Sequence, residues 1–302
     1  MQGIDVNRRQ LAQELTKTLN ASVEEMLAAS GEPSETPALR IGITGAPGVG
    51  KSSVIAKLAA LRVEAVSKLA VLAIDPSSPC SGGSLLGDRI RMDLLADNPD
   101  VYIRSLPSRS ANDGLCNNIP ALIQRLEDHG FAEIILETVG VGQAEYAIRN
   151  QVDTVILIMQ PESGDTIQSM KAGVVEMADI LVVNKSDLPG AEKVCAELED
   201  IAARGGRSEE WFPPVVTICA EDDAGIRSLS RAINLHTAWQ SEHRDNHEVA
   251  CQRQRYQLQS LLERRISELM DAKSPEFWLK PLPTSFRDIA RFLSATGLHR
   301  TD

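Results

Sequence analysis

Gly45-Ala46-Pro47-Gly48-Val49-Gly50-Lys51-Ser52 is the stretch that decides the fold, because it fits the pattern G-x-x-x-x-G-K-[ST] of a phosphate-binding loop. The apolar run 39–44 before it predicts a short buried strand. After it, apolar residues recur at helical spacing (Val54, Ile55, Leu58, Leu61). The sequence therefore predicts a strand, a tight turn and a helix N-terminus, where backbone N–H groups and the helix dipole favour an anion.

Two side chains of this loop carry chemistry. Lys51 can reach the β- and γ-phosphates of a nucleotide, and Ser52 offers a hydroxyl to Mg²⁺. For these residues alone, a chance glycine-rich turn is the alternative, and two further motifs argue against it. The eight residues therefore predict a loop that binds phosphates through its backbone N–H groups.

The second motif, Asn184-Lys185-Ser186-Asp187, directly follows the apolar run 180–183. We therefore expect it at the C-terminal end of a strand, where open α/β sheets bind their ligands. The carboxylate of Asp187 can accept hydrogen bonds from N1–H and the 2-amino group of guanine, a pair of donors that adenine lacks. Asn184 would brace the neighbouring loops, and the stem of Lys185 would lie along the base. The motif alone is equally consistent with a solvated loop, but after a phosphate-binding loop it predicts GTP rather than ATP.

The third motif is Glu137-Thr138-Val139-Gly140, which follows the apolar stretch 133–136. A carboxylate at a strand tip beside the phosphate loop usually supports Mg²⁺ and its waters, and Gly140 offers a backbone N–H to the γ-phosphate. The next residue is Val141, where many small GTPases carry a glutamine that orients the attacking water. Valine cannot orient water, so we expect slow intrinsic hydrolysis that a partner or another polar group completes.

Two more carboxylates are candidates for the metal. Asp75 follows the predicted strand 70–74, and Asp88 lies in a glycine-rich segment. Either could hold Mg²⁺ or a metal-bound water. The alternatives are a turn residue before proline for Asp75 and a helix N-cap for Asp88.

Composition limits the classes of partner. The chain has 302 residues and a formal net charge of −11, which argues against nucleic acid or an anionic membrane as the main partner. The N-terminus lacks the apolar segment of a secretion signal, and the apolar runs are too short to span a membrane. The five cysteines form no C-x-x-C pair, which fits a reducing compartment. These features predict a cytoplasmic protein.

Alternating strand and helix patterns across the middle of the chain predict an α/β fold with a doubly wound, mainly parallel sheet. Residues 8–30 form a helical pattern, interrupted by a capping-box signature at Ser22 and Glu25. A charged helical pattern after His236 ends at Ser274-Pro275 and precedes a short amphipathic tail. The predicted strands are 40–44, 70–74, 101–105, 133–137, 154–159, 180–184 and 215–219.

Three domains are predicted from this organisation: an N-terminal helical extension and linker over 1–38, a P-loop GTPase domain over 39–240, and a C-terminal helical arm over 241–302. The arm could serve dimerisation or docking of a partner. Within it, His243 and His247 stand at i and i+4 of an expected helix, a spacing that can bind metal but that fits a solvated helix face better.

Together the motifs resemble the MeaB (ArgK-like) family of G3E-type P-loop GTPases, which act as chaperones of adenosylcobalamin-dependent methylmalonyl-CoA mutase. The resemblance implies a homodimer that uses GTP and Mg²⁺, gates cofactor delivery to the mutase and protects it, with hydrolysis stimulated by that partner. Direct binding of cobalamin is not assumed. The runs that carry the resemblance are 42–53, 75–78, 82–92, 137–145 and 184–187, of which 137–143 is the most specific.

The resemblance also implies roles for individual residues. The phosphates would be held by Gly45, Ala46, Pro47, Gly48, Val49, Gly50, Lys51, Ser52 and Ser53. Mg²⁺ would be surrounded by Ser52, Asp75, Asp88 and Glu137, and the catalytic residues would be Lys51, Asp88 and Glu137. Guanine would be read by Asn184, Lys185 and Asp187 and by the segment Cys219, Ala220 and Glu221, in which the Ala220 backbone N–H would contact O6.

Residues 164–171 match the family's additional segment, through which the nucleotide state is communicated to the mutase; Asp165, Gln168 and Lys171 are its candidate residues. The chain departs from the family at 109–118, where a glycine-rich stretch is usual. This departure bears on how hydrolysis is triggered and on which mutase is the partner.

Two other classes of protein stay open. A P-loop kinase or transport-associated ATPase would use the same phosphate loop, but it predicts an acceptor pocket and ATP, which Asp187 argues against. A metal-insertion maturation GTPase would need a His-rich tract or paired cysteines near the nucleotide, and the sequence has neither.

Overall fold

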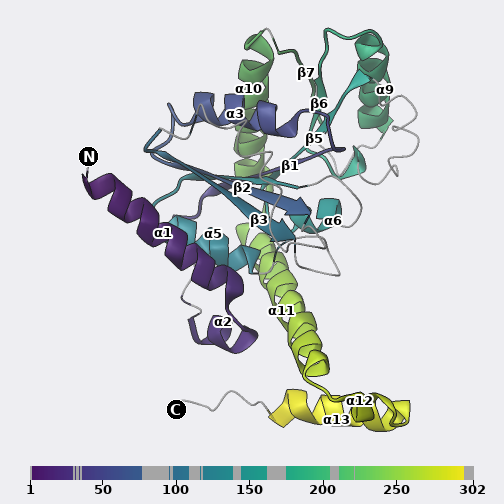
Figure 1. Ribbon diagram of the computed structural model, residues 1–302. Coiled ribbons are helices and arrows are strands. Elements are labelled where there is room, and N and C mark those ends of the chain that lie inside the picture. Colours follow the sequence, from purple (N-terminus) through teal and green to yellow (C-terminus); the bar gives the residue numbers. More distant parts are fainter. Residues whose placement is uncertain are drawn as a thin grey trace. The chain divides into compact units, whose positions relative to one another are not determined.

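The computed structural model describes residues 2–29, 31, 34, 36–76, 95, 98–108, 116, 118–138, 144–161, 175–204, 211–220 and 222–295. The chain divides into two compact units (Figure 1). The first consists of Met1–Asn20 and Gly31–Arg244, and the second of Ala21–Ser30 and Asp245–Asp302. The functional division at residues 38 and 240 stays a prediction.

A single sheet of seven strands forms the centre of the first unit among the described residues. Every strand pairing in it is parallel, which confirms the predicted α/β fold. The order is β3-β2-β4-β1-β5-β6-β7. Each predicted strand is present: β1 (Leu39–Thr44), β2 (Leu69–Pro76), β3 (Val101–Ser108), β4 (Glu133–Glu137), β5 (Thr154–Met159), β6 (Ile180–Asn184) and β7 (Val215–Ile218).

The sheet order places β1 at a topological switch point. From β1 the chain first builds β2 to β4 on one side of the sheet and then β5 to β7 on the other. Open parallel sheets bind ligands in the crevice at the carboxyl ends of the strands beside such a point. The phosphate loop leaves β1 at this edge, and the motifs that follow β4 and β6 reach the same edge.

Helices cover both faces of the sheet. On one face α3 (Lys51–Arg62) and α10 (Ala224–His243) pack together over apolar side chains of β1, β5 and β6. On the other face α9 (Ala191–Arg204) covers β6 and β7. Figure 1 shows α1 (Gln2–Asn20) and α5 (Ile119–Asp128) on the side of the sheet opposite α3. Because both faces are covered, the strands are continuously apolar, as their sequences indicate.

The predicted capping box begins a separate short helix, α2 (Val23–Ala29). The Ser22 backbone N donates to Glu25 Oε2 at 2.8 Å, and the Glu25 backbone N donates to Ser22 Oγ at 3.2 Å. These reciprocal bonds satisfy two N–H groups that a helix start leaves unpaired. The break between α1 and α2 is therefore confirmed.

The second unit contains α2, α11 (Asn246–Asp271), α12 (Pro275–Trp278) and α13 (Leu282–Ala295). One expectation was wrong: His243 ends α10, whereas His247 lies in α11, so the two are not on one helix. Asp245 causes the break, because its Oδ1 accepts from the His247 backbone N at 2.8 Å and caps α11. None of the helices that the structure describes is long and apolar enough to cross a membrane.

A buried ion pair joins the end of α3 to the start of β4. Arg62 Nε donates to Glu133 Oε2 at 2.7 Å, and the two side chains are only 7% and 5% exposed. We expect Arg62→Met to lower the free energy of unfolding by about 3–5 kcal/mol, because it leaves a buried carboxylate unpaired. Denaturant unfolding measures the change. Arg125→Met is the matched control, since its partner Asp128 is exposed and such pairs contribute about 0–1 kcal/mol; equal effects of both changes would contradict the prediction.

His236 is a buried base, 1% exposed, whose Nδ1 lies 2.8 Å from Thr154 Oγ1. Burial lowers the pKa of its imidazole, which outweighs the opposite effect of the nearby Asp179 carboxylate. The unfolded chain therefore binds the proton more readily, so this part of the stability is present above about pH 6.5 and is lost as the pH falls. We expect the free energy of unfolding to fall by up to about 1.4 kcal/mol per pH unit below that point. His236→Gln should flatten this dependence, and an unchanged profile in the variant would contradict the assignment.

Candidate functional site

At two positions of the phosphate loop between β1 and α3, both the backbone conformation and the close neighbours require glycine. Gly45 has φ 147° and Gly50 has φ 92°, values that other residues rarely adopt. A Cβ atom at Gly45 would lie 2.2 Å from the carbonyl oxygen of Ile158, and one at Gly50 would lie 2.4 Å from Asn184 Nδ2. The two glycines therefore let the loop lie directly against β5 and against the second motif.

Lys51 is the first residue of α3, and its side chain is buried. Its Nζ donates to the carbonyl oxygen of Gly45 at 2.8 Å and to that of Ala46 at 3.2 Å. These bonds hold the ammonium group across the loop that it follows. A cation in that position faces the oxygens of any phosphate bound by the loop and the helix N-terminus.

Ser52 and Glu137, two of the four predicted metal ligands, are brought together. Ser52 Oγ donates to Glu137 Oε1 at 3.1 Å, and both side chains are buried. Next to them, Thr138 Oγ1 donates to Thr44 Oγ1 at 3.0 Å, which joins the ends of β4 and β1. Hydroxyl and carboxylate oxygens suit Mg²⁺, which is usually held by one or two protein oxygens plus substrate phosphates and water. The pair therefore fits Mg²⁺, although no group of three or more His, Cys, Asp or Glu side chains gathers among the described residues.

The second motif is tied directly to the phosphate loop. Asn184, at the end of β6, donates from Nδ2 to the carbonyl oxygen of Val49 at 2.8 Å. Lys185 has φ 56°, and its Nζ donates to the Gly48 carbonyl oxygen at 3.3 Å and to Gln160 Oε1 at 2.7 Å. Asp187 lies exposed on the turn that follows. The turn that carries Asp187 therefore stands beside the loop, as a nucleotide spanning both would require.

A third segment, at the end of β7, joins the same corner. The Ser186 backbone N donates to the carbonyl oxygen of Ile218 at 3.0 Å, so the second motif and β7 meet directly. Cys219 then pairs with Asp222 in a short antiparallel bridge, and Ala220 between them is exposed. Lys57 of α3 reaches this segment and donates from Nζ to the Ala220 carbonyl oxygen at 2.9 Å.

Several predicted site residues lie outside the described part of the chain. Asp75 belongs to β2, but its side chain is among the undescribed ones. The others are Asp88, Gly140, Glu221, Asp165, Gln168 and Lys171. Their roles stay predictions.

Sequence reasoning missed Gln160, Thr44 and Lys57 as members of the site. Gln160 and Thr44 are polar residues at or directly after the ends of apolar strands, so their position at the carboxyl edge of the sheet was a usable signal. Lys57 had no such signal, because it stands on a helix and its partner is far away in the sequence.

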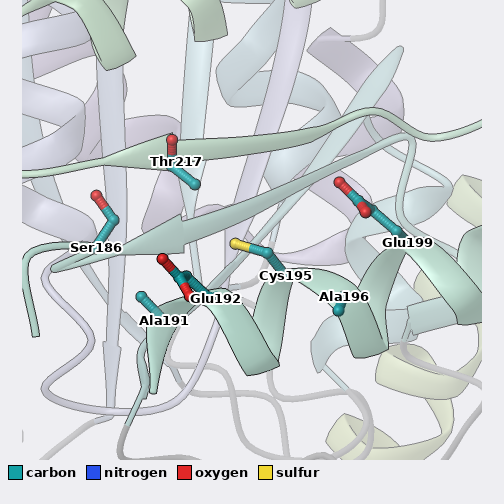
Figure 2. A pocket seen from close by; sticks show the side chains of 7 residues that line it. All are labelled: Ser186, Ala191, Glu192, Cys195, Ala196, Glu199 and Thr217. Atoms are coloured by element: carbon teal, nitrogen blue, oxygen red, sulfur yellow. The ribbon is translucent and has the colours of Figure 1, made fainter. Parts of the chain in front are cut away.

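Next to the second motif, a pocket of about 440 Å³ opens between α9 and β7. Figure 2 shows that most of its lining comes from α9, with Thr217 on β7 and Ser186 at the motif. Burial raises the pKa of the Cys195 thiol, and the nearby Glu199 and Glu192 carboxylates raise it further. Among the described residues, the lining combines two carboxylates with a thiol and includes no cation for a phosphate. The residues are Ser186, Ala191, Glu192, Cys195, Ala196, Glu199 and Thr217.

Comparisons with known proteins agree with this architecture. The solved structure of a "LAO/AO transport system kinase" superposes with a TM-score of 0.66 at 24% identity, covering 95% of this chain and 93% of that one, which supports the fold alone. "Probable GTPase Rv1496" of Mycobacterium tuberculosis (strain ATCC 25618 / H37Rv) is 41% identical over 208 residues, 68% of this chain and 62% of the relative. The "Methylmalonic aciduria type A homolog, mitochondrial" of Mus musculus is 38% identical over 227 residues, 74% of this chain and 54% of the relative.

The matched regions thus span less than two thirds of the length of these relatives. A comparison with protein families gives a broader match: residues 11–275 fit the family described as "Methylmalonyl Co-A mutase-associated GTPase MeaB". That range contains the phosphate loop, the second motif and every strand of the sheet. The chain therefore belongs to the MeaB (ArgK-like) family of G3E-type P-loop GTPases.

Proposed function

We propose that this protein hydrolyses GTP and acts as a chaperone of an adenosylcobalamin-dependent acyl-CoA mutase, either methylmalonyl-CoA mutase or a relative. The observation that carries the nucleotide assignment is the contact of Asn184 and Lys185 with the phosphate loop, which places the Asp187 turn beside it. The description of the family, which names methylmalonyl-CoA mutase, supports the choice of partner.

In the proposed mechanism, the phosphates of GTP lie on the backbone N–H groups of residues 45–53 and at the N-terminus of α3. Lys51 neutralises charge on the β- and γ-phosphates, and Asp187 accepts from the N1–H and 2-amino groups of guanine. Ser52 and Glu137 would hold Mg²⁺, with Asp75 and Asp88 as further candidates. When bound, the ion neutralises negative charge on the phosphate oxygens.

Slow hydrolysis by the isolated protein is part of the proposal. Val141 cannot orient a water molecule, so another polar group must complete the site, and we propose that binding of the mutase supplies or positions it. The segment with Asp165, Gln168 and Lys171 would report the nucleotide state to the mutase. Cobalamin itself is not proposed to contact this protein.

The C-terminal arm, residues 241–302, is proposed to form a protein interface, in a homodimer or with the mutase. In the second unit, Leu279, Leu282 and Phe286 are 86%, 81% and 72% exposed. Exposed apolar side chains grouped along the sequence are typical of surfaces that bind other proteins. Nucleic acid and membrane are not proposed as partners, and the cytoplasm stays the predicted location on the sequence grounds given above.

Hydrolysis of GTP and of ATP by the purified full-length chain tests the proposal. We expect slow turnover of GTP, little of ATP, and a rise of at least about tenfold in the GTP rate on adding the mutase. Heat-inactivated mutase is the matched control. A preference for ATP, transfer of phosphate to another acceptor, or a rate that the mutase leaves unchanged would contradict the proposal.

A further inference from the structure

We infer that Lys57 of α3 is a positioning residue for guanine recognition. It holds the base loop, defined as Cys219, Ala220, Asp222 and Asp223, so that the Ala220 backbone N–H is presented to O6 of the base. Lys57 Nζ donates to the Ala220 carbonyl oxygen at 2.9 Å and to Asp223 Oδ1 at 3.0 Å. The inference rests on the proposed function, because it concerns how the same site selects its nucleotide.

Among the described residues, few contacts besides those of Lys57 hold the base loop. Ala220, Asp222 and Asp223 are exposed, so packing of their side chains in the core does not hold them. The loop is anchored where it begins, by the bond from the Ser186 backbone N to the Ile218 carbonyl oxygen, and where it ends, by the bond from the Ala224 backbone N to Asp222 Oδ1 at 2.7 Å. Between these two anchors, Lys57 supplies a contact from a different element of the fold.

The contact from Lys57 restrains a peptide group next to the Ala220 N–H. The Ala220 N–H and carbonyl flank one Cα atom, so holding the carbonyl restricts rotation about the bond that joins the carbonyl carbon to that Cα. The Cys219–Asp222 bridge holds the peptide group on the other side. The two restraints together fix the direction of the Ala220 N–H before the base arrives, and a preorganised donor avoids the cost of ordering the loop on binding.

We attribute the positioning of the base loop to the bond from Lys57 to the Ala220 carbonyl oxygen rather than to the ion pair of Lys57 with Asp223. The Lys57 and Asp223 side chains are 40% and 67% exposed, and such pairs are screened by solvent. The same helix begins at Lys51 and Ser52, so α3 both receives the phosphates and holds the base loop. Losing one charge-assisted bond of this kind is expected to weaken guanine nucleotide binding about tenfold.

The test compares two nucleotides in wild type and Lys57→Met. GDP and 6-thio-GDP share N1–H and the 2-amino group, so both satisfy Asp187; only the acceptor at position 6 differs, and sulfur is the weaker acceptor. We expect Lys57→Met to weaken the binding of GDP about tenfold and the binding of 6-thio-GDP less, so that the two affinities become more similar. Calorimetry measures both affinities. In GTP hydrolysis the change should appear in KM rather than in kcat. Lys57→Arg should largely restore the preference for GDP over 6-thio-GDP.

Lys193→Met is the matched control, since it removes the same charge from an α9 lysine that is 80% exposed. If Lys57→Met binds GDP within twofold of wild type, or loses GDP and 6-thio-GDP affinity equally, the inference is overturned while the proposed function stands. If wild type itself does not distinguish GDP from ADP, the proposed function fails and this inference fails with it. A thermal unfolding curve that matches wild type shows that the variant is folded.

Discussion

Lys51→Ala is expected to lower kcat/KM for GTP by about 10³-fold or more. Lys51 is buried, and its ammonium group is held across the phosphate loop by the carbonyl oxygens of Gly45 and Ala46. In the proposed site, its removal would take away the charge-assisted bonds to the phosphates and also the stabilisation of charge that develops in the transition state. Removing one preorganised donor of this second kind typically costs about 10²–10³ in kcat.

Steady-state hydrolysis and GDP titration separate the two contributions to the loss. The control is Lys193→Ala, which removes an exposed lysine on α9 and should leave the rate within about twofold. A Lys51→Ala protein that hydrolyses GTP within tenfold of wild type would show that the phosphates are bound elsewhere. Circular dichroism establishes that both variants are folded.

Asp187→Asn is expected to change the preferred base from guanine to xanthine. A carboxylate accepts from both N1–H and the 2-amino group of guanine. An amide in its place accepts from N1–H but directs its NH₂ group at the second position, where guanine has a donor and xanthine has a carbonyl acceptor. Because unmatched polar groups at such sites cost about 1–3 kcal/mol each, the ratio of GTP to XTP affinity should fall by about 10²-fold or more.

Competition of GTP and XTP for the purified variant measures this ratio. Asp128→Asn, an exposed carboxylate on α5, provides the control and should keep the preference of wild type. An Asp187→Asn protein that retains the wild-type ratio would mean that Asp187 does not contact the base. The phosphate side of the site should be unaffected, so inorganic phosphate release at saturating XTP should approach the wild-type rate with GTP.

The strands were predictable because their signal is local. Val155, Leu157 and Val182 belong to short apolar runs, as expected for strands covered on both faces, and polar or glycine-rich segments bound those runs. The capping box was equally local, since Ser22 and Glu25 satisfy each other's backbone N–H groups. Strand order could not be predicted in this way, because no short stretch of sequence indicates that β1 lies between β4 and β5.

The helix predicted to run through His243 and His247 shows where a local sequence pattern misleads. Helical periodicity continues across Arg244 and Asp245, yet Arg244 is extended and Asp245 caps the next helix. His243 instead stacks on Trp239, with ring centroids 4.9 Å apart. When helical periodicity and a capping residue disagree, the capping residue therefore indicates better where one helix ends and the next begins.

The residues of the candidate site also fall into two groups, those that the sequence predicts and those that only the structure identifies. The phosphate loop, Asn184-Lys185-Ser186-Asp187 and Glu137 were found from the sequence, because each is a motif of fixed spacing at a strand end. Gln160 and Lys57 contribute through contacts with distant residues, Lys185 in one case and Ala220 in the other. Such contacts depend on the three-dimensional arrangement of strands and helices, which spacing along the chain does not encode.

The central position of β1 also bears on how the protein is made. β1 is the first strand of the sheet to leave the ribosome, but its two neighbours are β4 and β5, so it cannot pair along both edges until β5 has been added. The bond from Asn184 to Val49, which closes the loop against β6, must wait longer still. The loop proposed to bind GTP is therefore complete only late in synthesis, and GTP bound there would from that point stabilise the folded chain over the unfolded one by mass action. On the proposed function, the nucleotide would stabilise the newly made fold before it serves as a substrate.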